Sequence, residues 1–157
     1  MNWAHIHLVL THIPVIGIGA ILAFFLVGRI RRSDEVQWIS LQMFVALALV
    51  SIAVYLTGSP ASHQMREVPG VSRDLIRNHS DAADFAFTGV EVLGALALAL
   101  LVKFWGQAAV PTRLLDAILL LAVIVLGLLI WTAGLGGRIR HPEIVRAEIG
   151  HRLPGNG

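Results

Sequence analysis

The chain has 157 residues, of which 56% are hydrophobic and only 14% are charged. Soluble domains usually carry about 25% charged residues, and the mean hydropathy here is +0.75, so the composition argues against a water-soluble globule. It also excludes a disordered chain, which needs low hydrophobicity and high net charge. A net charge of only +2 with histidine neutral, and no long basic run, give no reason to expect nucleic acid as a partner.

Four apolar segments follow one another along the chain, and each is long enough to cross a bilayer, which takes about 20 residues. Isolated spanning segments must satisfy their own backbone hydrogen bonds, so helices are expected. The expected spans are 8–28, 36–57, 82–104 and 114–136. The sequence therefore predicts an all-α integral membrane protein. Its residues 1–157 would form one four-helix bundle with up-down-up-down topology.

Two segments outside the spans are predicted to lie at the membrane surface. Residues 58–80 are expected to form an interfacial loop containing a short helix that starts at Ser59-Pro60, and Ser72 is a candidate cap for a helix leading into the third span. Residues 142–157 are expected to form a short amphipathic helix and a tail. These elements place short interfacial helices on one face of the bundle.

Four spans put the N-terminus, residues 58–80 and the C-terminus on the same side of the membrane, here called the His face. Every histidine of the sequence lies on this side. Arg29, Arg31 and Arg32 follow the first span on the opposite side and mark it as cytoplasmic by the positive-inside rule, although the His face carries more arginines in total. A basic cluster after the apolar run is also the wrong polarity for a signal peptide. We expect a bacterial inner-membrane protein with a periplasmic His face.

The absence of cysteine and the presence of seven histidines limit the chemistry that the chain can carry. Disulfides, thiolate zinc sites, iron–sulfur clusters and covalent c-type haem are excluded. No Gly-rich phosphate loop, G-x-S-x-G or His-Glu-x-x-His motif is present. An electron-transfer or accessory subunit is therefore expected more than a catalytic one, and imidazole is the side chain left to hold a cofactor.

The histidines follow an approximate repeat. His12 opens the first span as His79 opens the third, and a Gly-x-x-x-x-His motif ends the second span and follows the fourth, which suggests a duplicated two-helix unit. In an up-down-up-down bundle the first and third helices are diagonal, so His12 and His79 are expected to face each other. Two opposed imidazoles are what bis-imidazole haem ligation requires. The candidate ligands of a haem b are His7, His12, His63, His79 and His141.

The same residues admit two other readings. Thioether and imidazole groups suit copper, so a copper or other divalent metal could be bound or transported by a set comprising His5, His7, His12, His63 and Met65. A cofactor-free scaffold that only anchors partner proteins is the third reading, since an interfacial histidine is often no more than a snorkelling or capping residue.

Glu91 stands out because it lies about two turns inside the third span, where an ionisable group is expensive and by default functional. Asp84 lies seven residues earlier on the same helical face. These two acids are candidates for a proton relay, or for acceptors that orient an imidazole N–H. The alternative is a protonated carboxyl that is hydrogen-bonded within the bundle.

The motif His7-x-x-x-x-His12-Ile13-Pro14 resembles the opening of the first span in a bacterial membrane-protein family catalogued as domain of unknown function 2231. The resemblance extends to His79 and to Gly136-Gly137 followed by His141, and covers roughly residues 5 to 142. Leu8 stands where the family usually has Pro, Ile13 where it has Phe, and the segment from Gly137 to His141 is shorter. The resemblance implies a four-helix membrane domain and mildly favours a role beside redox proteins.

These observations together predict a small b-type cytochrome-like protein that carries electrons or anchors a redox complex. Its expected partners are the lipid bilayer, a quinone, and a periplasmic or membrane redox protein. A homo-oligomer or a larger complex would be compatible with this role.

Overall fold

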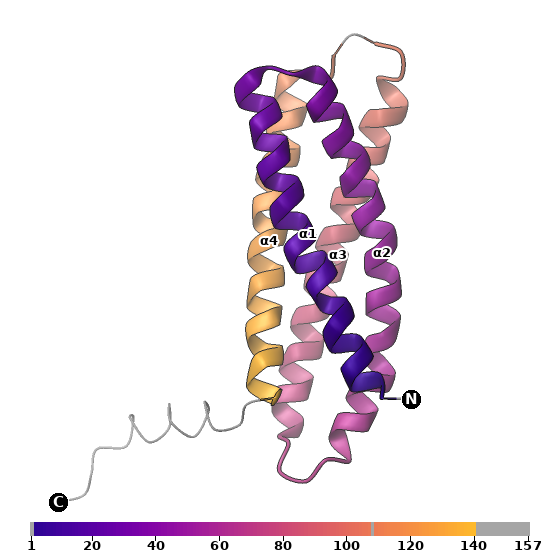
Figure 1. The fold of residues 1–157 in the computed structure, drawn as a ribbon, viewed down its shortest axis with the longest axis vertical. Coiled ribbons are helices and arrows are strands. Elements are labelled where there is room, and N and C mark those ends of the chain that lie inside the picture. Colours follow the sequence, from indigo (N-terminus) through magenta and orange to yellow (C-terminus); the bar gives the residue numbers. More distant parts are fainter. Residues whose placement is uncertain (1, 108, 141–157) are drawn as a thin grey trace, which may run out of the picture.

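The computed structural model describes residues 2–107 and 109–140. This part of the chain folds into four long helices, which are α1 (Trp3–Arg31), α2 (Asp34–Arg66), α3 (Arg73–Lys103) and α4 (Thr112–Arg140). Each helix packs against the next, and α4 closes the bundle against α1, so α1 and α3 are diagonal, as are α2 and α4 (Figure 1). The predicted all-α four-helix bundle with up-down-up-down topology is confirmed.

All four helices are long and apolar enough to cross a membrane. Their outward surfaces carry large apolar side chains, of which Ile16, Leu49, Phe85 and Val102 are each 65% or more exposed. Such a surface is stable against lipid tails and not against water, so we describe the chain as a membrane-spanning bundle.

Short polar residues start three of the helices. The side chains of Asn2, Ser33 and Ser72 accept hydrogen bonds from the first-turn amides of His5, Val36 and Leu75, respectively. These caps satisfy amides that have no partner within the helix. Arg32 adopts a left-handed conformation (φ 52°) and lets α1 turn into α2 within two residues. The predicted cap at Ser72 is confirmed.

The prediction of an interfacial loop over residues 58–80 is wrong. The helix α2 continues through Pro60 to Arg66 and α3 already begins at Arg73, so only the segment 67–72 links them. Pro60 removes one helical hydrogen-bond donor, but membrane helices tolerate this where neighbouring helices hold them in place. The predicted interfacial helix at 142–157 lies outside the described residues.

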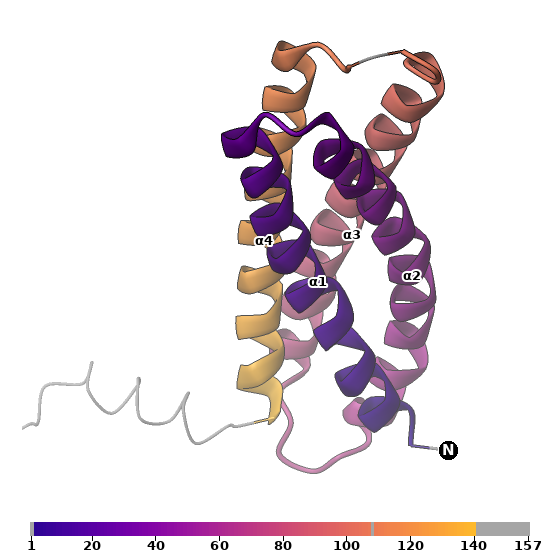
Figure 2. The same cartoon turned by 45° about the horizontal axis from the view of Figure 1, so that its top comes forward.

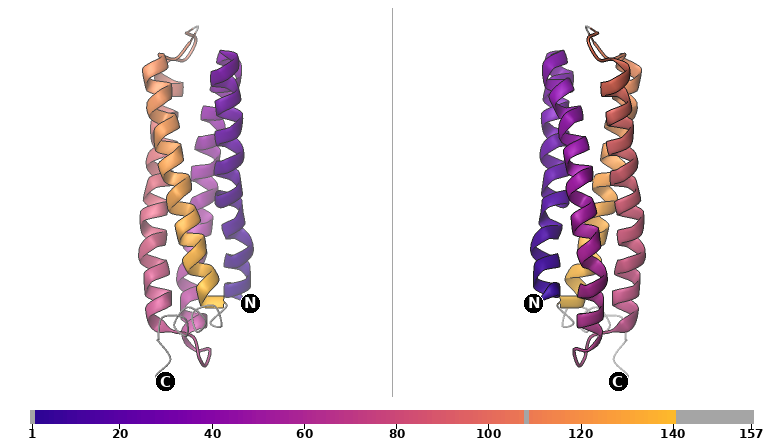
Figure 3. Two further views of the ribbon diagram at one scale, coloured as in Figure 1. Left: turned by 90° about the vertical axis from the view of Figure 1, so that its left-hand side faces the viewer. Right: turned by 90° about the vertical axis from the view of Figure 1, so that its right-hand side faces the viewer.

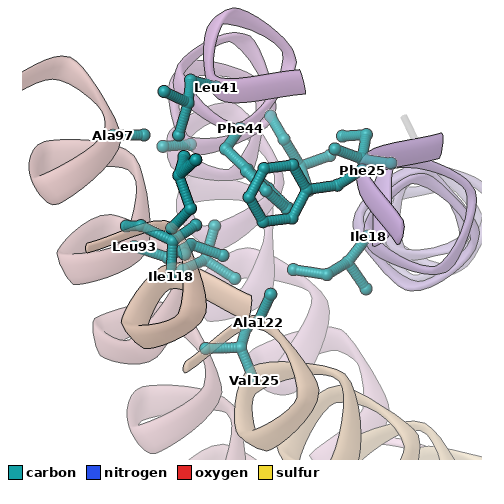
Figure 4. Packing of buried hydrophobic residues seen from close by; sticks show 14 of the residues in the cluster. Ile18, Phe25, Leu41, Phe44, Leu93, Ala97, Ile118, Ala122 and Val125 are labelled. Carbon is teal, nitrogen blue, oxygen red and sulfur yellow. The ribbon is translucent and has the colours of Figure 1, made fainter. Parts of the chain in front are cut away.

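The core is densest in the half of the bundle away from the His face. Phe25 and Phe44 meet there edge to face, with ring centroids 6.0 Å apart, and Ile18 and Leu93 pack around them from α1 and α3 (Figure 4). All four are almost completely buried. Aromatic pairs of this kind add about 0.5–1.5 kcal/mol to the burial of their area, so this half holds the helices together.

Buried positions repeat between the two helix pairs. In α1 the residues Pro14, Ile18, Ile21 and Phe25 are buried, and at constant spacing they match Ala86, Val90, Leu93 and Ala97 of α3. In α2 and α4 the buried positions correspond in the same way: Gln37, Ser40, Phe44, Leu47, Ser51 and Val54 match Leu115, Ile118, Ala122, Val125, Leu129 and Thr132. This pattern supports the predicted two-helix repeat. It corrects one detail, because the residue equivalent to His79 is His7 and not His12.

The helix α1 leans across the bundle (Figures 1 and 2). At the His face it lies against α2, where the Ala4 amide donates to Oε1 of Gln64 at 3.0 Å. At the opposite end Arg29 of α1 forms an ion pair with Asp116 of α4. Seen from the sides, α4 lies beside α3 at the end opposite the His face and approaches the N-terminal end of α1 at the His face (Figure 3). The His-face half of the bundle is hollow.

Candidate cofactor cavity at the His face

A cavity of about 650 Å³ occupies the His-face half of the bundle and is lined by all four helices. It is hollow because small residues replace the large core side chains of the other half, with Gly58 and Ala61 on α2, Ala83 on α3 and Gly136 on α4. Most of the lining is apolar. Cofactor sites typically measure about 300–1,000 Å³ and combine apolar walls with a few placed polar groups. The cavity is therefore of a size and character to enclose a planar cofactor.

Two histidines meet in the cavity from diagonal helices. The ring centroids of His7 on α1 and His79 on α3 are 6.5 Å apart, and the planes of the rings are inclined at 79°. Both side chains are half-buried and both line the cavity. They are the equivalent residues of the two helix pairs, so the repeat brings like residues together near the bundle axis.

Hydrogen bonds fix the protonation of both rings. Nδ1 of His79 lies 3.1 Å from the Thr132 carbonyl oxygen, which can only accept, so Nδ1–H donates. Nδ1 of His7 lies 2.8 Å from Oγ1 of Thr57. The Thr57 hydroxyl donates its one proton to the Val54 carbonyl at 2.6 Å, so its oxygen can only accept from the His7 ring. Here too Nδ1–H is the donor. In a neutral imidazole this leaves the lone pair on Nε2. A ring in this tautomer can bind a metal through Nε2.

Glycine lets each imidazole pack directly on the neighbouring helix. A Cβ at Gly58 would lie 3.4 Å from Cε1 of His7, and a Cβ at Gly136 would lie 3.2 Å from Cε1 of His79. A Cβ at Gly136 would be closer to His79 than an ordinary contact, and a Cβ at Gly58 would just reach van der Waals contact with His7. Both glycines serve the histidines in the same way, which extends the repeat from the buried positions to the site.

The spacing of the two rings suits one metal ion between them. A metal–imidazole nitrogen bond is about 2.0–2.1 Å long. With the ring geometry added, two imidazoles on opposite sides of one ion have centroids about 6.4 Å apart. The observed centroid separation of 6.5 Å, in a T-shaped contact, is close to this length, so His7 and His79 are the side chains that would hold an iron in this cavity.

A second polar group lies on the rim of the cavity, between α2 and α3. The Tyr55 hydroxyl donates to Oδ1 of Asp84 at 2.9 Å, and the Tyr55 ring stacks on Phe87 with centroids 4.1 Å apart. Tyr55 and Asp84 are both exposed and both line the cavity. The predicted acid Asp84 is therefore held by a tyrosine, at the His-face end of the α2–α3 groove.

Deeper in the same groove, Oγ of Ser51 and Oε1 of Glu91 are buried atoms without a hydrogen-bond partner. Two contacts bracket the pair along the antiparallel helices, one being the stack of Tyr55 on Phe87 and the other the close approach of Gly94 to Ala48. Ser51 and Glu91 therefore lie opposite each other across the groove. Ser51 is 5% exposed and lines the deep end of the cavity.

The remaining predicted ligands lie away from the histidine pair. His12 is exposed at the cavity wall, and its Nδ1 bonds to the Leu8 carbonyl of its own helix at 2.8 Å. The expected pairing of His12 with His79 is wrong, because the ring that meets His79 is His7. Position 7 lies on the same helical face as the buried residues Pro14, Ile18 and Ile21, whereas position 12 lies on another face of α1.

The candidate copper ligands are spread over the His face. His5 and His63 are exposed, and Met65 is half-buried at the cavity wall. Over residues 2–107 and 109–140 no three His, Asp or Glu side chains group closely enough to hold a metal ion by themselves. His141 lies outside the described residues, so its role as a candidate haem ligand stays a prediction.

Comparison of the chain with models of known protein families, with curated proteins and with solved structures finds no match. No family is shown in this way. The resemblance to domain of unknown function 2231 stays a prediction.

Sequence reasoning missed the residues that support the histidines. Thr57 and Thr132 fix the rings, yet a threonine in an apolar helix carries no signal of its own. Glycine in a helix is no signal by itself either, because Gly17 and Gly94 are helix-packing contacts and a Cβ at Gly127 would meet nothing within 4 Å. The signal that did exist was the spacing of Gly58 and Gly136, which recurs between the helix pairs.

Proposed function

We propose that the protein is a small b-type cytochrome-like membrane protein in which His7 and His79 bind haem b in the His-face cavity. The observation that carries the proposal is the paired geometry: two imidazoles from diagonal helices, 6.5 Å apart, each with Nδ1–H held by the adjacent helix. Haem supplies one-electron chemistry when it is bound. The chain's own residues would orient the two ligands and exclude water around them.

The supporting residues have separate tasks in this proposal. Thr57 and the Thr132 carbonyl hold the two rings in the ligand tautomer, which also raises their basicity as ligands. Gly58 and Gly136 keep the neighbouring helices close to the rings. The apolar walls keep the site at low dielectric, which tunes the potential of a bound haem. His5, His12 and His63 have no ligand role in this arrangement.

Haem titration into the purified protein in detergent tests the proposal. We expect one haem per chain to bind with the split α/β bands of a reduced low-spin b-type centre. His7→Ala and His79→Ala should each lose this spectrum, whereas His63→Ala, an exposed histidine on the same face, should retain it. An unchanged spectrum in His79→Ala, or no specific haem uptake by the wild type, would refute the assignment.

The electron-transfer role implies partners and a membrane. The proposal takes the resemblance to domain of unknown function 2231 as a guide to a bacterial inner-membrane protein that exchanges electrons with a quinone or with a redox protein, as a carrier or as an anchor subunit. The Arg29, Arg31 and Arg32 cluster supports a cytoplasmic position for the end opposite the His face.

The orientation can be tested cleanly because the chain has no cysteine. A single cysteine at His63→Cys should react with a membrane-impermeant maleimide added to intact cells, and one at Glu35→Cys should react only after lysis. Both side chains are exposed in the bundle. The reverse labelling pattern would place the His face in the cytoplasm.

A further inference from the structure

Glu91 and Ser51 form the one feature of the described bundle whose buried polar atoms remain unexplained. More than nine in ten buried polar atoms in proteins have a hydrogen-bond partner, and an unpaired acid inside a membrane is expensive. Here the orphan atoms are Oε1 of Glu91 and Oγ of Ser51. Ser51 lines the deep end of the cavity, and Glu91 lies across the α2–α3 groove from it, beside the cavity. A proton on the carboxyl, and water in the cavity, would satisfy both.

A polar track connects this pair with the His face. Ser51 is one helical turn from Tyr55 on α2, and Glu91 is two turns, or roughly 10 Å, from Asp84 on α3. Tyr55 and Asp84 are bonded to each other at 2.9 Å and are both exposed. The track therefore runs along the α2–α3 groove from the exposed Asp84 to the half-buried Glu91.

Glu91 has no cation to balance a charge. On α3 the nearest formally charged side chain toward the His face is Asp84, and toward the other end it is Lys103. The facing helix α2 presents Ser51 and Tyr55 to it. No Asp, Glu, Lys or Arg occurs between Val36 and Met65, between Ala117 and Gly137, or before Arg29, so the other helices add only the histidines of the cavity. His79 lies twelve residues before Glu91 on α3, roughly 18 Å along the helix axis, so an electron that enters the cavity would act on Glu91 over a distance of that order.

We propose that Glu91 is a proton-binding site linked to electron transfer: its carboxylate takes up one proton, supplied through Asp84 and Tyr55, when one electron enters the cofactor in the cavity. The inference rests on the proposed haem function. One O–H bond forms on the carboxylate as the iron gains one electron, and the proton leaves again on oxidation. The charge inside the bundle stays constant, which avoids an uncompensated buried charge.

The test is an electrode titration of the haem-containing protein at a series of pH values. The midpoint potential should fall as pH rises, with a slope of up to about 59 mV per pH unit. This limit holds because a tenfold change in the equilibrium constant of a one-electron couple corresponds to about 59 mV. Glu91→Gln should bind haem with a low-spin spectrum but give a pH-independent potential. Glu91→Asp, which restores a carboxyl, and Glu67→Gln, in the exposed turn between α2 and α3, should both keep the slope.

Reduced-minus-oxidised infrared spectroscopy gives a second readout. The wild type should show a protonated-carboxyl band that Glu91→Gln lacks and Glu67→Gln keeps. A haem-containing wild type with a flat potential, or a Glu91→Gln protein with an unchanged slope and band, would overturn this inference alone. A wild type that takes up no haem would overturn the proposed function, and this inference with it.

Discussion

The close approach of α2 and α3 depends on Gly94, and replacing it tests the packing that holds Ser51 opposite Glu91. A Cβ at Gly94 would overlap the methyl carbon of Ala48, and the Phe44 carbonyl oxygen lies 3.5 Å from the same point. Carbon atoms in contact normally stay about 3.5–4.0 Å apart. Alanine has no rotatable side chain that could give way, so in Gly94→Ala the two helices must separate.

Overpacking of this kind costs about 1–3 kcal/mol. For a chain of this size each kcal/mol shifts the melting temperature by roughly 2–4 °C, so Gly94→Ala should melt about 2–12 °C below the wild type. The measurement is thermal unfolding in detergent, followed by circular dichroism. Gly127→Ala is the matched control, because a Cβ there meets nothing within 4 Å and alanine favours the helix by up to about 1 kcal/mol.

A compensating change separates packing from other effects of the substitution. Ala48→Gly removes the methyl group that the new Cβ would strike, so Ala48→Gly in the Gly94→Ala background should recover much of the lost stability. If Gly94→Ala melts with the wild type, or if the double variant is no better than the single one, the helices are not in the contact described and the reasoning fails.

Two further predictions address the site and the opposite end of the bundle. Thr57→Val removes the acceptor for Nδ1–H of His7 and should weaken haem binding by about 10- to 100-fold, measured by titration; unchanged affinity would mean that the hydrogen bond does not orient the ring. Arg29→Gln breaks the ion pair with Asp116. The side chain of Arg29 is 20% exposed and that of Asp116 is 54% exposed. A double-mutant cycle with Asp116→Asn should therefore give a coupling below about 1 kcal/mol, and a larger value would show that the pair is shielded from water.

The four helices could be predicted from the sequence because their signal is local. Runs of about 20 uncharged residues, broken by arginines or by Pro and Gly, indicate spanning helices whatever their neighbours do. The error over residues 58–80 has a local cause too. Gly58 and Pro60 usually end a helix in water, but here Gly58 admits the His7 ring and α2 continues past both.

The histidine pair could be predicted only in outline. Its location on one face follows from topology, and the diagonal arrangement of α1 and α3 follows from the order of the helices. Which of His7 and His12 points inward follows from the helical phase, because His7 precedes the buried Pro14 by seven residues and shares its face, but a run that is apolar on every side does not mark its buried face in the sequence. Ser51 and Glu91 are brought together only by the packing of α2 on α3.

A redox titration of the haem-reconstituted protein, followed by its absorption spectrum, tests the central claim most directly when His7→Met is measured beside the wild type. Two imidazole ligands predict a low-spin haem in the wild type, and replacing one of them by a thioether predicts a low-spin haem with a raised midpoint potential in the variant. A spectrum and potential that are identical in the two proteins would show that His7 is not a ligand and would contradict the account.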